Sequence, residues 1–135
     1  MYNELDEIRK RKIESYKKYI KGEKEMEKNL LDAPLVIKDA DFDETIKKYS
    51  ILVVDCWAPW CGPCRMMTPI INDLAKEMQG KIVFGKVNVD ENPMTSMKYK
   101  VMSIPTLLVF KNGNLVDKII GAFPKEELKN KLNLY

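Results

Sequence analysis

The chain of 135 residues contains no histidine, only three cysteines and no long apolar run. No stretch approaches the ~18 consecutive apolar residues that a membrane-spanning helix needs. The first residues also lack the apolar core of a signal peptide. We therefore expect a cytoplasmic protein, in a compartment that keeps thiols reduced. The net charge of +3, from 23 basic and 20 acidic residues, is too balanced for a nucleic-acid surface, so we expect no nucleic-acid partner.

The shortage of sulfur and imidazole ligands also limits metal chemistry. Structural zinc takes four nitrogen or sulfur ligands, and this chain offers three thiols at most. We therefore expect no metal site, although a cluster shared between two subunits stays open as an alternative. All three thiols lie in one stretch, Cys56–Cys64, and two of them form a Cys-x-x-Cys motif. In a reducing compartment this motif indicates redox chemistry or metal binding.

Composition divides the chain into a charged extension, residues 1–32, and a main domain, residues 33–135. The extension has charges of both signs and no proline before residue 30, and Ile13, Tyr16 and Ile20 repeat at helical spacing. This pattern predicts an amphipathic helix over about residues 3–28. Its apolar side could pack on the main domain, or residues 1–30 could dock a partner or a second copy of the chain. Both interpretations stay open.

The main domain alternates between patterns of strand and helix. Asp41 followed by Glu44 predicts the capped start of a helix that runs to about Tyr49. Residues 51–57 are apolar on both faces except at Asp55, as in a strand covered on both sides. The predicted strands are 35–37, 51–57, 82–89, 106–110 and 115–120, and the other predicted helices are 61–79, 92–99 and 125–134. This order predicts an α/β fold with a mixed central sheet flanked by helices on both faces.

Cys61 and Cys64 have the spacing of a redox centre. Three residues apart at a helix start, they share one face, and their Cα atoms fall within disulfide range. A bridge that closes so short a loop stabilises little, which favours a switch over a staple. The helix N-terminus should lower the pKa of Cys61 and favour its thiolate. We hypothesise that Cys61 attacks a partner disulfide and that Cys64 resolves the mixed disulfide.

A carboxylate inside the apolar strand is the second unusual feature. Burial should raise the pKa of Asp55, which lies at the carboxyl end of the strand that leads to the cysteines. We hypothesise that Asp55 takes the proton of Cys64, through a water molecule; a purely structural aspartate is the alternative. Lys86, in the next strand, is a candidate counter-charge or an ordinary surface lysine. Cys56 points away from Asp55 along the strand and is expected to be an inert buried thiol.

With Trp60-Cys61-Gly62-Pro63-Cys64 in place, residues 33–135 resemble the thioredoxin family. The resemblance also rests on Val53-Val54-Asp55, Pro69, Val87-Asn88-Val89-Asp90, Ile104-Pro105-Thr106, Lys111-Asn112-Gly113 and Gly121-Ala122, in this order. It implies a thioredoxin fold and a general protein disulfide reductant that acts on disulfide-containing target proteins. It also implies that electrons come from a thioredoxin reductase linked to flavin or ferredoxin, with no cofactor in the chain itself.

The resemblance assigns roles residue by residue. It implies that Cys61 is the nucleophile, Cys64 the resolving thiol, Asp55 the buried acid and base, and Lys86 the strand lysine near it. It implies a cis-proline at Pro105, beside which the substrate chain pairs as an added strand. The implied substrate groove is lined by Trp60, Gly62, Pro63, Ile104, Pro105, Gly121 and Ala122. Met102-Ser103 stands where many members have a basic residue or glycine, which could alter substrate preference.

Two further functions stay open at this point. The first is an oxidase or isomerase on the same fold, although in the family a Gly-Pro pair between the cysteines goes with reductants. The second is a binding module in which the fold is a scaffold and the extension docks it to a complex.

Overall fold

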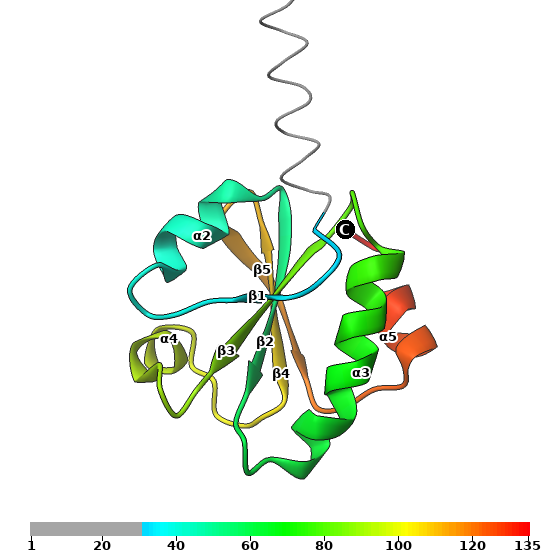
Figure 1. Ribbon diagram of the computed structural model, residues 1–135. Coiled ribbons are helices and arrows are strands. Elements are labelled where there is room, and N and C mark those ends of the chain that lie inside the picture. Colours follow the sequence, from blue (N-terminus) through cyan, green and yellow to red (C-terminus); the bar gives the residue numbers. More distant parts are fainter. Residues whose placement is uncertain (1–30) are drawn as a thin grey trace, which may run out of the picture.

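The computed structural model describes residues 31–135 and contains a five-stranded sheet in the order β1-β3-β2-β4-β5 (Figure 1). The predicted helix over residues 3–28, and any docking through residues 1–30, lie outside the described residues. The strands are β1 (Leu35–Val36), β2 (Ile51–Trp57), β3 (Val83–Asn88), β4 (Thr106–Lys111) and β5 (Asn114–Ile120). The helices are α2 (Phe42–Lys48), α3 (Gly62–Glu77), α4 (Pro93–Lys98) and α5 (Lys125–Leu132).

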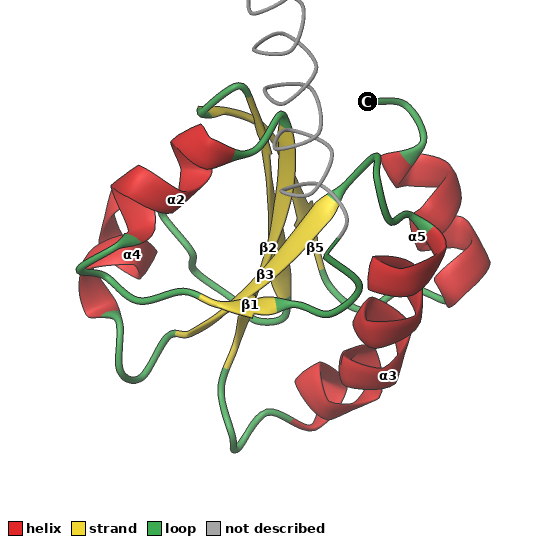
Figure 2. Ribbon diagram, turned by 45° about the horizontal axis from the view of Figure 1, so that its top comes forward, coloured by secondary structure: helices red, strands yellow, loops and turns green. Residues whose placement is uncertain are grey.

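The sheet is mixed and covered on both faces, as predicted. Strand β3 pairs in parallel with β1 and β2, whereas β4 pairs antiparallel with β2 and β5. Helices α3 and α5 lie on one side of the sheet and α2 and α4 on the other (Figures 1 and 2). The elements predicted within residues 33–135 are all present, with ends that differ by at most two residues because terminal turns are the least determined by local sequence.

Central strand β2 divides the apolar core into two layers. Leu52, Val54 and Cys56 pack in the layer under α2 and α4. Val53 packs in the layer under α3 and α5. Since side chains alternate along a strand, Asp55 faces the α3 side, immediately beyond that apolar layer.

The predicted capping box of α2 is not formed. Asp41 occupies the N-cap position, but its side chain caps no helical N–H. Its carboxylate instead accepts a hydrogen bond from the backbone N–H of Lys38 at 2.8 Å. A short aspartate side chain can bond locally in this way, which competes with capping.

Helix α4 is capped from a distant loop. The Asp39 carboxylate accepts hydrogen bonds from the backbone N–H groups of Met94 and Thr95, at 3.1 and 2.9 Å, and from the Thr95 hydroxyl at 2.6 Å. The side chain of Asn92 in turn accepts from the backbone N–H of Asp39 at 2.8 Å. These bonds tie the start of α4 to the loop between β1 and α2.

The register brings four connections to one end of the sheet. Cys56 pairs with Thr106, and Thr106 pairs with Ile120. The turn after β2, the loop before β4 and the segment after β5 therefore meet at the carboxyl end of β2. The loop between β3 and α4 lies at the same end, because β3 runs parallel to β2.

Candidate active site

Cys61 and Cys64 are joined in a disulfide at the start of α3, with their Cα atoms 5.2 Å apart. Cys61 is the N-cap residue, and its sulfur accepts a hydrogen bond from the backbone N–H of Cys64 at 3.2 Å. The N–H of Cys64 thus points at the Cys61 sulfur, and together with the helix dipole it favours negative charge there. Both residues are buried, with 4% and 2% of their surfaces accessible.

The turn that carries Cys61 is held by its own backbone and by one arginine. Arg65 donates two hydrogen bonds to the carbonyl oxygen of Pro59, from Nε at 3.2 Å and from Nη2 at 2.8 Å. The backbone N–H of Cys61 donates to Ala58 at 3.1 Å. Sequence reasoning assigned no role to Arg65; its position one residue after Cys64, within one turn of the site, was the available signal.

Trp60 is the exposed side chain beside the disulfide, with 67% of its surface accessible. Its indole Nε1 donates a hydrogen bond to the carboxylate of Asp90 at 2.9 Å. Asp90 lies two residues after the end of β3, and the sequence alone indicated no role for it, although it belongs to the motif Val87-Asn88-Val89-Asp90. The bond fixes a large apolar surface next to the reactive sulfur.

The peptide bond between Ile104 and Pro105 is cis, as the resemblance implied. The carbonyl oxygen of Ile104 lies 3.8 Å from the Cys61 sulfur, and the carbonyl of Pro105 accepts from the backbone N–H of Gly121 at 2.9 Å. Gly121 has a φ of +102°, a conformation that favours glycine.

The other predicted groove residues lie around this point. Gly62 and Pro63 are exposed in the first turn of α3, and Ala122 is exposed directly after Gly121. Substrate contact by any groove residue stays a prediction.

Asp55 is buried, with 5% of its surface accessible, and pairs in register with Lys86 on β3. Burial raises the pKa of Asp55 from an ordinary 3.8 to about 7, and the nearby charge of Lys86 acts in the opposite direction. Within the described residues, one carboxylate oxygen of Asp55 has no hydrogen-bond partner. The carboxyl group can therefore change its protonation near neutral pH.

A partly polar cavity connects Asp55 to the α3 side of the molecule. It has a volume of about 220 Å³, which exceeds the roughly 30 Å³ that one water molecule occupies. Lys86 borders the cavity, so the predicted pair of Asp55 and Lys86 faces one space. The remaining lining residues are Pro34, Trp57, Thr68, Ile71 and Asn72. Sequence reasoning missed Thr68 and Asn72, polar residues four apart on α3.

Cys56 is the free cysteine of the described residues and is fully buried on the opposite face of β2. Burial, and then the charge of Asp55, raises its pKa to about 12. A thiol with this pKa forms almost no thiolate at neutral pH, which fits the predicted inert role.

No helix of residues 31–135 is long and apolar enough to cross a membrane. Over the same residues, no group of three or more histidine, cysteine, aspartate or glutamate side chains could hold a metal ion.

Comparisons with known proteins agree with this geometry. The thioredoxin family model matches residues 33–134. The chain is 52% identical over 101 residues to the chloroplastic M-type thioredoxin of Pisum sativum, which covers 74% of this chain and 59% of the pea protein. It is 50% identical over 97 residues to a thioredoxin of Staphylococcus aureus, which covers 72% of this chain and 92% of the relative.

A solved structure shows the same fold. A point mutant of the thioredoxin from Halobacterium salinarum superposes with a TM-score of 0.72 at 31% identity, over 78% of this chain and 92% of that one. The family model alone spans well over half of the chain. The chain therefore belongs to the thioredoxin family, whose members are protein disulfide oxidoreductases.

Proposed function

We propose that this thioredoxin-family protein reduces disulfides in target proteins through its Cys61–Cys64 couple, with Cys61 attacking and Cys64 resolving. The observation that supports this assignment most directly is the position of Cys61 at the N-cap of α3, where the N–H of Cys64 points at its sulfur at 3.2 Å. A thiolate at Cys61 is stabilised by this N–H and by the helix dipole. Cys64 lies inside the first turn and has no such arrangement.

The reaction proceeds in two exchanges. The Cys61 thiolate bonds to one sulfur of the target disulfide, and the other target sulfur leaves as a thiolate. The Cys64 thiolate then bonds to the Cys61 sulfur, and the second target sulfur leaves. Two electrons have passed to the target, and the protein is left with the Cys61–Cys64 disulfide that the structure contains.

In this proposal Asp55 serves as the base for the second exchange. Cys64 must lose its proton before it attacks, and a carboxylate with a pKa of about 7 is well matched to accept it at neutral pH. Water in the cavity beside Asp55 carries the proton. Lys86, paired with Asp55 in register, stabilises its charged form.

The target chain lies along the loop of Ile104 and Pro105, where it adds a short strand by backbone hydrogen bonds. Trp60, Gly62 and Pro63 line one side of this groove, and Gly121 and Ala122 line the other. The short distance between the Ile104 carbonyl and the Cys61 sulfur, 3.8 Å, supports this placement. A target strand bonded to this loop would hold its disulfide against Cys61.

Members of the family act on disulfide substrates and are reduced by thioredoxin reductase. For this chain we propose a flavin- or ferredoxin-linked reductase as the electron donor, and the cytoplasm as its compartment. The reduced thiols that the proposed reaction needs are typical of the cytoplasm.

Trapping tests the order of the two thiols. The Cys64→Ser variant should accumulate a covalent adduct with a disulfide-containing protein, visible on a non-reducing gel and linked through Cys61 by mass spectrometry. The Cys61→Ser variant is the matched control and should form none. An adduct on Cys64 in the control, or none in the Cys64→Ser variant, contradicts the assignment.

The reduction potential tests the direction of transfer. Equilibration with dithiol buffers, followed by tryptophan fluorescence, should give a potential below that of the cytosolic glutathione pool. A potential near those of strong oxidants would reverse the proposed direction.

A further inference from the structure

An apolar groove of about 470 Å³ lies between the active-site turn and α4. Its lining contains no charged side chain. The lining residues are Trp60, Val89, Pro93, Ser96, Met97, Val101, Met102, Ser103 and Ile104. A groove with this lining favours an apolar occupant, because a charged group buried there would have no partner.

The groove is continuous with the reactive sulfur. Trp60 precedes Cys61 directly, and Ile104 places its carbonyl oxygen 3.8 Å from the Cys61 sulfur. Both residues also line the groove. A target segment whose cysteine is bonded to Cys61 would therefore place its neighbouring residues at the mouth of this groove.

Two methionines of the groove have no part in the proposed chemistry. Met97 on α4 and Met102 in the loop before β4 are 78% and 91% exposed. Water-exposed apolar side chains that line a concavity gain stability when a partner covers them. Methionine is unbranched and polarisable, so it adapts its shape to the partner and makes favourable contacts with aromatic rings.

We propose that Met97 and Met102 form a specificity pocket for a large apolar, preferably aromatic, side chain that lies within a few residues of the target cysteine. The inference rests on the proposed function and names the class of target that it acts on. It assigns the preference to these two side chains, apart from the residues expected to hold the target backbone. The indole of Trp60, held by its hydrogen bond to Asp90, lines the same groove.

A pair of peptides tests the preference directly. Each carries one intermolecular disulfide, and they differ only in phenylalanine or serine at the positions flanking the cysteine. We expect the protein to reduce the phenylalanine peptide with a kcat/KM roughly tenfold higher. If the protein reduces both peptides equally, the inference is wrong and the proposed function stands. If it reduces neither peptide, the proposed function fails and the inference fails with it.

The double variant Met97→Gln, Met102→Gln links the preference to the pocket. Glutamine keeps the length of methionine and adds no charge. The kcat/KM of the phenylalanine peptide should therefore fall to between about one and three times that of the serine peptide, mainly through a higher KM for the phenylalanine peptide. A ratio unchanged in the double variant would overturn the inference. Because the comparison is a ratio within one variant, a general loss of activity leaves it readable.

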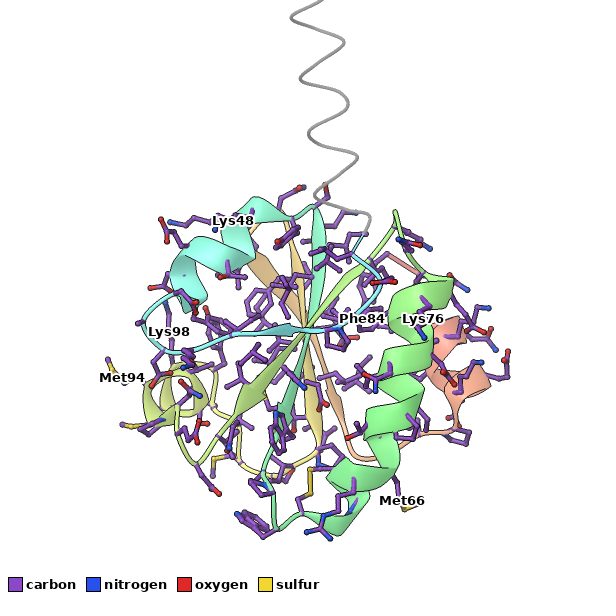
Figure 3. The ribbon with its side chains drawn as sticks, in the orientation of Figure 1. Lys48, Met66, Lys76, Phe84, Met94 and Lys98 are labelled. Carbon is purple, nitrogen blue, oxygen red and sulfur yellow. A yellow bond between two sulfur atoms is a disulfide. The ribbon has the colours of Figure 1, made fainter. Side chains whose placement is uncertain are left out.

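Met94→Gln is the matched control. Met94 lies on the same helix and is 71% exposed, but it does not line the groove, and its side chain points outward from α4 (Figure 3). This variant should keep the full preference. The preference should also be independent of protein concentration; a preference lost at high concentration would mean that a second copy fills the groove, and would overturn the inference.

Discussion

Asp55 and Cys56 are consecutive residues of β2 that face opposite sides of the sheet. Burial raises the pKa of both, to about 7 for Asp55 and to about 12 for Cys56. The carboxyl group is brought into the neutral range, whereas the thiol is moved further out of it. The same physical effect thus makes one group able to exchange protons at neutral pH and leaves the other unreactive.

The surroundings on the two faces strengthen this difference. On the α3 side, Asp55 borders a cavity of about 220 Å³ together with Lys86 and Thr68. On the other side, Cys56 is packed among apolar residues under α2 and α4 and has no accessible surface. A titratable group acquires a function here only where burial is combined with a route for protons. Substitutions on one face of β2 at a time test this difference between Asp55 and Cys56.

The largest effect is expected from the thiols. The Cys61→Ala variant should lose disulfide reduction completely, because neither Cys56 nor Cys64 occupies the N-cap position of α3. Cys56→Ala should keep the rate of the unchanged protein and lose about 1 kcal/mol of unfolding free energy, the cost of a small core cavity. Reduction of a disulfide-containing protein, with dithiothreitol as electron source, measures the rates of both variants. Urea unfolding measures the unfolding free energy of Cys56→Ala. A large loss of rate in Cys56→Ala would mean that the buried thiol of Cys56 takes part in the redox reaction, against the expectation from its burial.

The next largest effect is on stability and depends on pH. Asp55 has a raised pKa in the folded state, so its contribution to stability is complete below pH 3.8 and is lost as the pH rises to about 7. Replacement by neutral asparagine removes this loss. At pH 8 the Asp55→Asn variant should be more stable by on the order of 4 kcal/mol, and near pH 3.5 the gain should vanish.

Urea unfolding at the two pH values measures this difference. Asp43→Asn, at an exposed carboxylate that pairs with Lys98 on the surface, is the control and should change stability by less than about 0.5 kcal/mol. The resolving step of Asp55→Asn should also slow above neutral pH, so that stability and activity change in opposite directions. A stability gain that persists at pH 3.5 would show that the gain does not come from titration.

On the α4 side, removal of the cap that Asp39 forms on α4 should have a smaller effect on stability. Asp39→Ala removes the hydrogen bonds that Met94 and Thr95 donate to one carboxylate, so we expect a loss of about 1 kcal/mol. Amide exchange should accelerate at the start of α4. Asp41→Ala is the matched control, since the Asp41 side chain accepts from Lys38 only and caps no helix. An equal loss of unfolding free energy in both variants would mean that the cap of α4 by Asp39 stabilises the protein no more than the local hydrogen bond of Asp41.

Whether a feature could be predicted from the sequence depends on how far apart in the sequence its residues lie. The strands and helices predicted within residues 33–135 and the pairing of Cys61 with Cys64 rest on local patterns, and the structure contains all of them. The bond between Trp60 and Asp90 spans 30 positions, and the cap of Thr95 by Asp39 spans 56. Only the tertiary register brings such residues together, so no local pattern indicated them. Asp55 was the exception, because a charged residue inside an apolar strand is conspicuous in the sequence itself.

The smallest expected effect comes from Lys86, whose charge lowers the pKa of Asp55 against the dominant effect of burial. Replacing Lys86 by methionine keeps the apolar stem and removes the charge, so the pKa of Asp55 should rise above about 7. The pH at which the resolving step reaches half of its maximal rate should rise with it. Carbon NMR titration of the Asp55 carboxyl group measures the pKa directly.

Lys98→Met is the control for this titration, because Lys98 lies on the α4 side and pairs with exposed Asp43. It should leave the titration of Asp55 unchanged. An unchanged pKa in Lys86→Met would mean that burial alone sets the pKa of Asp55 and that Lys86 is an ordinary surface lysine. A rise confined to Lys86→Met would instead show that the two faces of β2 differ in charge as well as in access to water.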